Sequence, residues 1–291
     1  MEAERVGKKM NKKHSTGIMQ GRLTPPKGRG IQFFPFDGWQ SEFEKAQGLG
    51  LNDIEFIFDL DQYESNPLWT DGGVSEIQSL INKSGVLVNN ICGDFFMRRP
   101  FFRVEENVRK ENVEVLKKLI VSASNIGARN VEIPILDNSS LKTKEEEDIL
   151  VRSLTECLET ARSNNIILSV EADLPPVKLL NLLKKFPGHQ VKVVYDSGNS
   201  SGLGYDPYEE VTTLGDFIIN AHIKDRVLGG GTVSLGTGSA DFDKLFTGLK
   251  KINYQGAFTL QAARGSDGNE SETTNTYLNF LAPYLAGLRS Y

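Results

Sequence analysis

The sequence predicts a single (β/α)₈ TIM barrel of the α/β class over residues 16–291, and three observations support this prediction. The chain has 291 residues, close to the roughly 250 residues that one such barrel usually needs. Amphipathic helical segments alternate with short, almost continuously apolar segments, which is typical of a parallel sheet covered by helices. The alternation repeats eight times, which favours closure into a barrel, and no GxGxxG motif follows the first strand to indicate a dinucleotide-binding sheet.

Each expected strand after the first follows a helical segment whose apolar residues are three or four positions apart. After the opening strand at 17–21, the first helix and strand pairs are 39–50 with 53–58, 74–85 with 86–91, 105–127 with 130–135, and 143–165 with 166–171. The remaining pairs are 177–186 with 191–196, 208–214 with 217–222, and 241–252 with 257–261, before a closing helix at 272–288. Glycines at 50, 85 and 127 supply the left-handed residue that commonly ends a helix.

Composition is that of an ordinary globular protein and argues against several functions. The chain is 39% hydrophobic and 24% charged, with a net charge of −5, so it can bury a large core. The acidic balance argues against nucleic-acid binding, which normally needs a basic face. Cys92 and Cys157 form neither a disulfide framework nor a CxxC motif, and we predict two free thiols in a reducing compartment.

The beginning of the chain is basic and lacks an apolar run, so residues 1–15 are expected to form a disordered leader rather than a secretory signal. No stretch approaches the roughly 18 consecutive apolar residues of a membrane span. The sequence therefore predicts a cytoplasmic protein without a membrane segment.

Polar residues stand at the carboxyl ends of the last four expected strands, the edge at which such barrels carry their active sites. Side chains alternate along a strand, and the apolar set must face the helices. By that parity the inward-facing residues at the mouth are Glu171, Asp196, His222 and Gln261, although Lys192 blurs the alternation on the sixth strand. We expect these four side chains to lie together.

Two carboxylates and an imidazole crowded at this edge are costly unless paired, and one divalent cation would pair them. Glu171, Asp196, His222 and the amide oxygen of Gln261 suit Mn²⁺ or Mg²⁺, with Zn²⁺ and Co²⁺ as alternatives. The competing interpretation is that Glu171 and Asp196 pair with Lys224, Arg226 or Arg264 and bind no metal.

Further candidates for substrate binding at the same edge are Arg22, Glu55, Asn90, Arg226 and Arg264. The guanidinium of Arg22 suits a phosphate or a carboxylate, and a salt bridge at the rim is its alternative. Glu55 faces inward, where a structural ion pair with an arginine is the alternative. A turn-forming role is the default for Asn90, and Asn199 is assigned to the turn after Asp196.

Two loops carry weaker signals. The glycine-rich stretch at 229–238 is interpreted as a lid or as a loop ending at a helix N-cap, Ser239 or Asp241, with a phosphate cradle as the alternative. Four phenylalanines after the third strand, at 95, 96, 101 and 102, suggest an apolar lip over the mouth or a contact of a homodimer.

Several motifs resemble those of the xylose-isomerase-like superfamily of sugar-phosphate isomerases and epimerases. They are Gly-Ile-Met-Gln-Gly-Arg-Leu (17–23), Ile-Glu-Phe-Ile-Phe-Asp (54–59), Glu171, Asp-Ser-Gly-Asn (196–199), His-Ile-Lys-Asp-Arg (222–226) and Leu-Gly-Thr-Gly-Ser-Ala-Asp-Phe (235–242). The resemblance extends over residues 16 to 285 in the right order. It implies a single Mn²⁺-type site on strands five to eight, and it is specific for the superfamily but not for the substrate.

One residue departs from the pattern of the ketose 3-epimerases in this superfamily, which carry a second glutamate where this chain has Gln261. In the superfamily that this chain resembles, those epimerases use two carboxylates, one on each face of the substrate, to remove and return a proton. An amide can bind a metal through its oxygen but cannot take a proton at neutral pH. A two-base epimerisation by Glu171 and Gln261 is therefore disfavoured.

The residues and the resemblance together predict a divalent-metal-dependent isomerase or epimerase of a small sugar or polyol, with or without a phosphate. Glu171 is expected to remove the proton beside a metal-polarised carbonyl, with Lys224 protonating the enediolate oxygen. A metal-dependent dehydratase acting through the same enolate is the first alternative, and a non-catalytic barrel that binds sugar or metal is the second. The superfamily's apurinic endonuclease needs more zinc ligands than a chain with three histidines offers.

Overall fold

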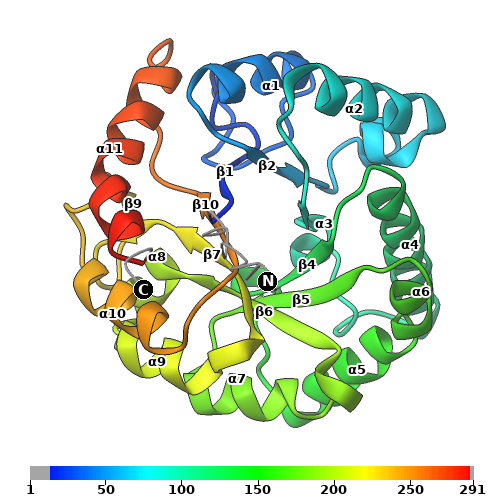
Figure 1. The fold of residues 1–291 in the computed structure, drawn as a ribbon. Coiled ribbons are helices and arrows are strands. Elements are labelled where there is room, and N and C mark those ends of the chain that lie inside the picture. The colour runs from blue at the N-terminus through cyan, green and yellow to red at the C-terminus, as the bar shows by residue number, and fades with distance from the viewer. Residues whose placement is uncertain (1–13, 289–291) are drawn as a thin grey trace, which may run out of the picture.

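The computed structural model describes residues 14–288, in which eight parallel strands close into a barrel ringed by helices (Figure 1). Around the barrel the strands follow the order β1, β10, β7, β6, β5, β4, β3, β2, so strands that follow one another in the chain lie side by side. Pairing of β1 with both β10 and β2 closes the ring. The predicted (β/α)₈ barrel is confirmed.

The elements have the following bounds. The barrel strands are β1 (Thr16–Met19), β2 (Asp53–Ile57), β3 (Asn90–Cys92), β4 (Asn130–Ile135), β5 (Ile167–Ala172), β6 (Val191–Asp196), β7 (Ile218–Ile223) and β10 (Ala257–Leu260). The outer helices are α1 (Trp39–Gly48), α2 (Asp71–Ser84), α4 (Glu106–Asn125), α5 (Lys144–Thr155), α6 (Leu158–Ser163), α7 (Pro176–Leu183), α9 (Pro207–Leu214), α10 (Phe242–Lys251) and α11 (Glu270–Leu288). The loops hold α3 (Phe95–Arg98), α8 (Ser197–Leu203), the hairpin of β8 (Asp225–Arg226) with β9 (Thr232–Val233), and 3₁₀ turns at Tyr63–Ser65, Pro67–Trp69, Asp137–Ser139, Pro187–His189 and Gly215–Phe217.

Two elements differ from the expected ones. The third strand is shorter than the expected 86–91, because the backbone and side-chain N–H groups of Asn89 donate to the carboxylate of Asp53 and not to a neighbouring strand. Before it, only an isolated bridge at Leu87 joins β2. The single helix expected over 143–165 is two helices, since the N–H of Cys157 bonds to the oxygen of Leu154, three residues back, and this tighter turn separates α5 from α6.

The apolar core fills the layer between the strands and the surrounding helices. Leu168 and Val170 of β5 and Leu116 and Ile120 of α4 are all fully buried. Each such side chain contributes about 1.5–3 kcal/mol relative to full exposure. The opposite parity of the strands faces the barrel interior, where β2, β4 and β7 contribute several buried polar side chains: Glu55, Glu132, Asn220 and His222. Such an interior departs from the branched aliphatic layers that usually fill these barrels.

The phenylalanines after β3 do not form a lip over the mouth. Phe95, Phe96, Phe101 and Phe102 are each at most 1% exposed, and the rings of Phe96 and Phe101 stack with centroids 5.1 Å apart. Phe95 and Phe96 lie on α3, Phe101 and Phe102 lie on the bend that follows it, and all four belong to the apolar core. The sequence-based interpretation as an exposed lip or dimer contact is therefore wrong for these residues.

The glycine-rich loop after β7 wraps an internal carboxylate. Asp225, fully buried, accepts hydrogen bonds from the backbone N–H groups of Gly236, Gly238 and Ala240. A Cβ at Gly238 would lie 2.2 Å from the Asp225 carboxylate, which explains the glycine. Asp241 caps α10 by accepting from the N–H of Lys244, so the predicted N-cap is confirmed. The backbone N–H groups of the loop bind the Asp225 carboxylate and not a phosphate.

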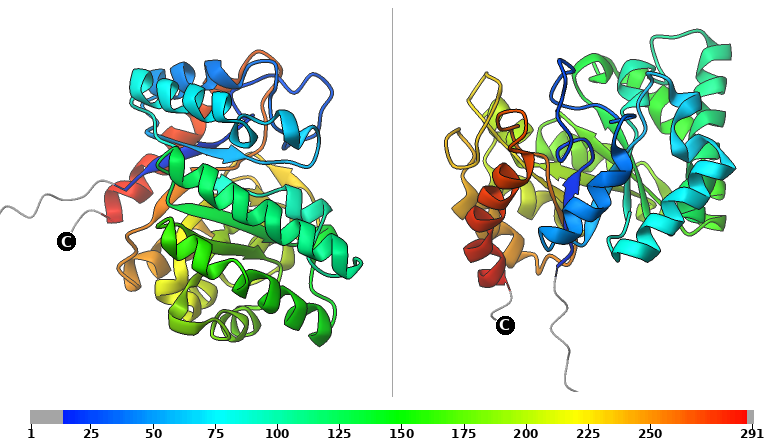
Figure 2. Two further views of the ribbon diagram at one scale, coloured as in Figure 1. Left: turned by 90° about the vertical axis from the view of Figure 1, so that its right-hand side faces the viewer. Right: turned by 90° about the horizontal axis from the view of Figure 1, so that it is seen from above.

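The first described residues and the end of α11 lie at one end of the barrel, and the long loops that follow β1 and β7 lie at the other (Figure 2). Residues 1–13 of the predicted leader lie outside the described residues. His14 and Ser15 already contact the barrel, with His14 Nδ1 3.1 Å from the oxygen of Gly256 and Ser15 donating to Asn52. Within 14–288, no helix is both long enough and apolar enough to cross a membrane.

Candidate active site at the barrel mouth

The four expected mouth residues lie on, or directly after, four adjacent strands. Parallel pairing places Asp196 of β6 beside His222 of β7, and the N–H of Gln261, just after β10, donates to the oxygen of Ile223 at 3.1 Å. Ligand atoms of Glu171, Asp196 and His222 all lie within 4.8 Å of one another. The convergence of side chains expected from strand parity is therefore what the structure contains.

The imidazole of His222 is at the centre of this group and is fully buried. Its Nε2 lies 3.0 Å from Glu55 Oε2 and 3.5 Å from Glu132 Oε2, below the mouth. Its Nδ1 faces Glu171 Oε2 at 3.6 Å and Asp196 Oδ2 at 4.0 Å, but has no hydrogen-bond partner among residues 14–288. If Nε2–H donates to Glu55 and the ring is neutral, the Nδ1 lone pair points toward the two mouth carboxylates, so a cation bound between them would displace the second proton of the ring.

Charge in this cluster is balanced by protons as well as by pairing. Burial on its own lowers the pKa of His222, but the charges of Glu55 and Glu132 raise the pKa well above the ordinary histidine value. Burial raises the pKa of Glu132 well above that of an ordinary glutamate. For Glu171, burial opposes ionisation, yet the nearby imidazole of His222 and the charge of Lys224 lower its pKa to about 2. Glu171 is therefore an ionised, hydrogen-bonded carboxylate at neutral pH.

The ammonium of Lys224 lies among the oxygens expected to bind a metal. Its Nζ is 3.3 Å from Asp196 Oδ2, 3.3 Å from Gln261 Oε1 and 3.2 Å from Asn199 Oδ1. The competing interpretation of a Lys224–Asp196 ion pair is thus realised in this structure. The same contacts show that these oxygens face a common position that suits a cation.

Asn199 belongs to the site, although the sequence assigned it only to the turn after β6. Its N–H donates to Asp196 Oδ1 at 2.7 Å, which starts α8, and this turn directs the side chain into the mouth. There the amide nitrogen donates to Glu171, and the amide oxygen accepts from Lys224 and from Arg226, the latter at 3.1 Å. The spacing of an N-cap aspartate three residues before an asparagine was the available signal.

Among the other substrate-binding candidates, Arg226 is in contact with the cluster through Asn199, and its remaining donors bind the oxygen of Gly230. Glu55 and Asn90 lie deeper in the barrel. Glu55 pairs with His222 and Asn220 and not with an arginine, and Asn90 accepts from Asn130 within the interior and does not form a turn. Strand parity indicates which way a side chain faces but not its depth, which explains both differences.

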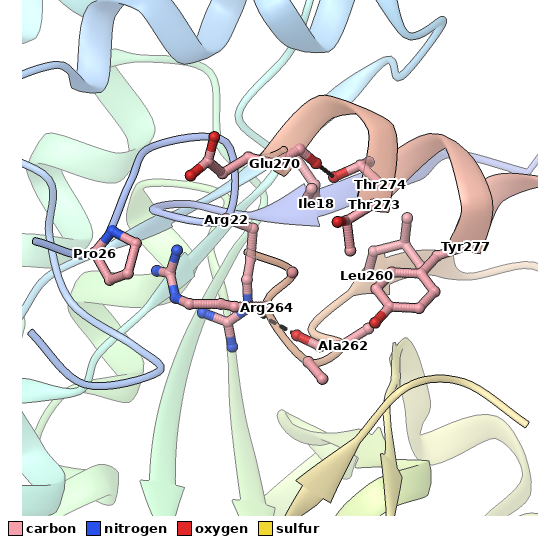
Figure 3. Close-up of a pocket in the computed structure, with 12 residues that line it drawn as sticks. Ile18, Arg22, Pro26, Leu260, Ala262, Arg264, Glu270, Thr273, Thr274 and Tyr277 are labelled. Atoms are coloured by element: carbon pink, nitrogen blue, oxygen red, sulfur yellow. Dashed lines mark hydrogen bonds between the residues drawn. The ribbon is translucent and has the colours of Figure 1, made fainter. Parts of the chain in front are cut away.

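Arg22 and Arg264 form a separate pair between β1, β10 and the start of α11, where a pocket of about 360 Å³, including open solvent, lies beside them (Figure 3). Arg22 donates from Nε to the oxygen of Ala262 at 3.1 Å, and Arg264 donates to the oxygens of Ile31 and Thr24. Burial, followed by the nearby charge of Arg264, lowers the pKa of Arg22 to about 9. The pair fixes the loop after β1, and Arg22 also binds the backbone of Ala262, the residue that follows Gln261.

Comparison with known proteins identifies the class. The model of the xylose isomerase-like TIM barrel family matches residues 43–284. The chain belongs to this family.

Individual relatives of the chain are named as sugar epimerases. A Haemophilus influenzae protein named "Putative L-ribulose-5-phosphate 3-epimerase SgbU" is 28% identical over 264 residues, covering 86% of this chain and 89% of that protein. The L-ribulose-5-phosphate 3-epimerase UlaE of Escherichia coli O157:H7 is 26% identical, covering 77% and 81%. The D-psicose 3-epimerase of Clostridium cellulolyticum H10 shares the fold with a TM-score of 0.73 and 14% identity, covering 93% and 99%.

Proposed function

We propose that this chain is a divalent-metal-dependent isomerase or epimerase of a small sugar or sugar phosphate, acting by proton abstraction beside a carbonyl. The observation that carries the proposal is the convergence of Glu171, Asp196 and Gln261 oxygens with the unpartnered Nδ1 of His222. The names of the relatives support a sugar substrate.

The residues present fit a divalent ion. His222 Nδ1 is buried without a hydrogen-bond partner and faces two carboxylates across 3.6 and 4.0 Å. A divalent ion between these groups would replace the ring proton that the neighbouring carboxylates favour. Glu171, Asp196, His222 and Gln261 would hold the ion, and the mostly oxygen donor set makes Mn²⁺ the first candidate. Such an ion supplies Lewis-acid polarisation of the substrate carbonyl, which makes the neighbouring C–H more acidic.

The chain's own residues then divide the proton chemistry. Glu171 is ionised and oriented by the amide of Asn199, so it is the proposed base that removes the substrate proton. Lys224 is the proposed proton donor to the developing enediolate oxygen, and its ammonium is held by hydrogen bonds to three side-chain oxygens. Glu55 accepts from His222 Nε2 and so fixes the ring with Nδ1 toward the mouth.

Gln261 bears on which isomerisation takes place. Its amide cannot carry a proton at neutral pH, so Glu171 acts alone on one face of the substrate unless another group serves the opposite face. A single base favours transfer of a proton between adjacent carbons, as in aldose–ketose isomerisation. The relatives named as 3-epimerases make L-ribulose 5-phosphate the first substrate to test.

The proposal is tested by exchange of substrate protons with solvent deuterium in the presence of Mn²⁺, followed by NMR on L-ribulose 5-phosphate and on D-psicose. The wild-type protein should exchange a proton next to the carbonyl, and Glu171→Gln should slow this exchange at least about 100-fold, because it removes the base. Glu159→Gln, an exposed glutamate of α6 paired with Arg162, is the matched control and should leave the rate unchanged. Equal exchange by Glu171→Gln and wild type would contradict the assigned base.

A further inference from the structure

Three hydrogen bonds in series cross the barrel mouth from the loop after β3 to the end of β10. Asp94 Oδ2 accepts from Gln32 Nε2 at 2.8 Å, and Gln32 Oε1 accepts from Gln261 Nε2 at 3.0 Å. Gln261 Oε1 then faces Lys224 Nζ at 3.3 Å. The loop after β1 thus brings Gln32 between two residues that are distant in the sequence.

Asp94 determines which group donates and which accepts in each hydrogen bond of this series. This carboxylate is 6% exposed, and its other oxygen lies 3.4 Å from the Cys92 thiol, which donates to it. Burial raises the pKa of Cys92 well above the ordinary value, so the thiol keeps its proton, and burial raises the pKa of Asp94 to about 6, which leaves it mostly ionised at neutral pH. An ionised carboxylate only accepts hydrogen bonds, so Gln32 must present its amide nitrogen to Asp94.

Once Gln32 is oriented, Gln261 has one favourable orientation. The Gln32 oxygen faces β10 and also lies 3.5 Å from Arg22 Nη2, so Gln261 must offer its nitrogen to it. The Gln261 oxygen is then left facing Lys224 Nζ, which lies at the position that suits a cation. A reversed amide would present N–H groups to a cation and could not bind it. A glutamate has two equivalent oxygens and would not need this control.

We propose that Asp94, acting through Gln32, is a positioning residue that holds the oxygen of Gln261 toward the metal position. The inference rests on the proposed metal-dependent function and explains how an amide serves as a defined ligand in this chain. Asp94 itself touches neither the metal position nor the four proposed ligands through any hydrogen bond described within 14–288.

The test is the affinity for Mn²⁺, measured by isothermal titration calorimetry on the full chain without substrate. Asp94→Asn can present either an oxygen or an NH₂ group to Gln32, so the Gln261 amide is no longer held in one orientation. We expect the Kd to rise about tenfold, the lower end of the effect typical of groups that orient a metal ligand. Asp59→Asn is the matched control, because Asp59 pairs with Arg98 and not with Gln32, and its Kd should match the wild type.

A second background separates orientation from a general structural effect. In Gln261→Glu, the carboxylate presents an oxygen to the metal in either orientation. Adding Asp94→Asn in this background should therefore leave the Kd for Mn²⁺ unchanged or lower it. An equal loss in both backgrounds, or no loss in either, would overturn the proposal. If Asp94→Asn fails to fold, Gln32→Ala in the half-exposed loop replaces it. The Kd for Mn²⁺ is then measured for Gln32→Ala in the wild-type and Gln261→Glu backgrounds, with the same expected outcomes.

The failure of this inference is distinguishable from failure of the proposed function. Wild-type protein that binds Mn²⁺ with the same Kd as Asp94→Asn overturns the positioning role and leaves the metal-dependent function intact. Wild-type protein that binds no divalent ion overturns both.

Discussion

The position of Lys224 among the mouth oxygens requires a glycine at residue 198. The aliphatic part of this lysine passes directly over Gly198 of α8, where a Cβ would lie 2.4 Å from Lys224 Cγ and 2.8 Å from its Cβ. The glycine of the Asp-Ser-Gly-Asn motif is therefore explained by close approach of a side chain, and not by an unusual backbone conformation.

Gly198→Ala should displace Lys224 from Asp196, Asn199 and Gln261 without removing any charged group. If Lys224 donates the proton as proposed, misplacement on the order of 1 Å should lower kcat at least about tenfold while Mn²⁺ is still bound. Steady-state kinetics with the substrate found by deuterium exchange would measure this. Gly72→Ala of α2, where an added Cβ meets nothing within 4 Å, is the control, and equal kcat values for both variants would argue against the role of Lys224.

At the scale of elements, β6, α8 and α9 are tied together beneath the site by one buried carboxyl. Glu210 of α9 accepts hydrogen bonds from Tyr195 of β6, at 3.1 Å, and from Ser200 of α8. Asp196 and Asn199 lie next to these two partners in the chain. The geometry of the mouth is therefore supported by a group that plays no part in the proposed chemistry.

Stability should depend on the protonation of Glu210. Burial raises the pKa of Glu210 from 4.5 to about 7 in the folded state, so the stability that its protonated form contributes is complete below about pH 4.5 and is lost as pH rises through 7. Glu210→Gln cannot ionise, and its free energy of unfolding relative to wild type should increase by about 1–3 kcal/mol between pH 5 and pH 8. Urea unfolding at both pH values measures this, and a difference that does not change with pH would refute the assignment.

Most elements could be predicted from the sequence because their apolar periodicity reflects burial between sheet and helices. The exceptions have local causes. Seven-residue α8 has no apolar stripe, so the turn that brings Asn199 into the site was visible only as a capping pattern. The phenylalanines around α3 carry no periodicity that separates an exposed lip from a buried cluster, and their burial depends on tertiary packing.

At the scale of the whole molecule, the barrel brings together residues from β5, β6, β7 and β10 that are up to 90 positions apart. Strand parity and the rule that active sites lie at the carboxyl ends of strands were enough to predict the cluster of Glu171, Asp196, His222 and Gln261. The series through Gln32 and the depth of Glu55 could not be predicted, because loop conformation and the level of a side chain along the barrel axis arise only on folding. The homodimer and the leader remain predictions.

The central claim is that these four side chains form one divalent-metal site. It is tested most directly by metal content, measured by mass spectrometry on wild type and His222→Ala after purification without chelator and dialysis against mixed Mn²⁺, Mg²⁺, Zn²⁺ and Co²⁺. We predict about one ion per wild-type chain, which is lost in His222→Ala because that variant removes the buried nitrogen ligand. A wild-type chain that retains no ion, or a His222→Ala chain that retains as much as wild type, would contradict the proposed site.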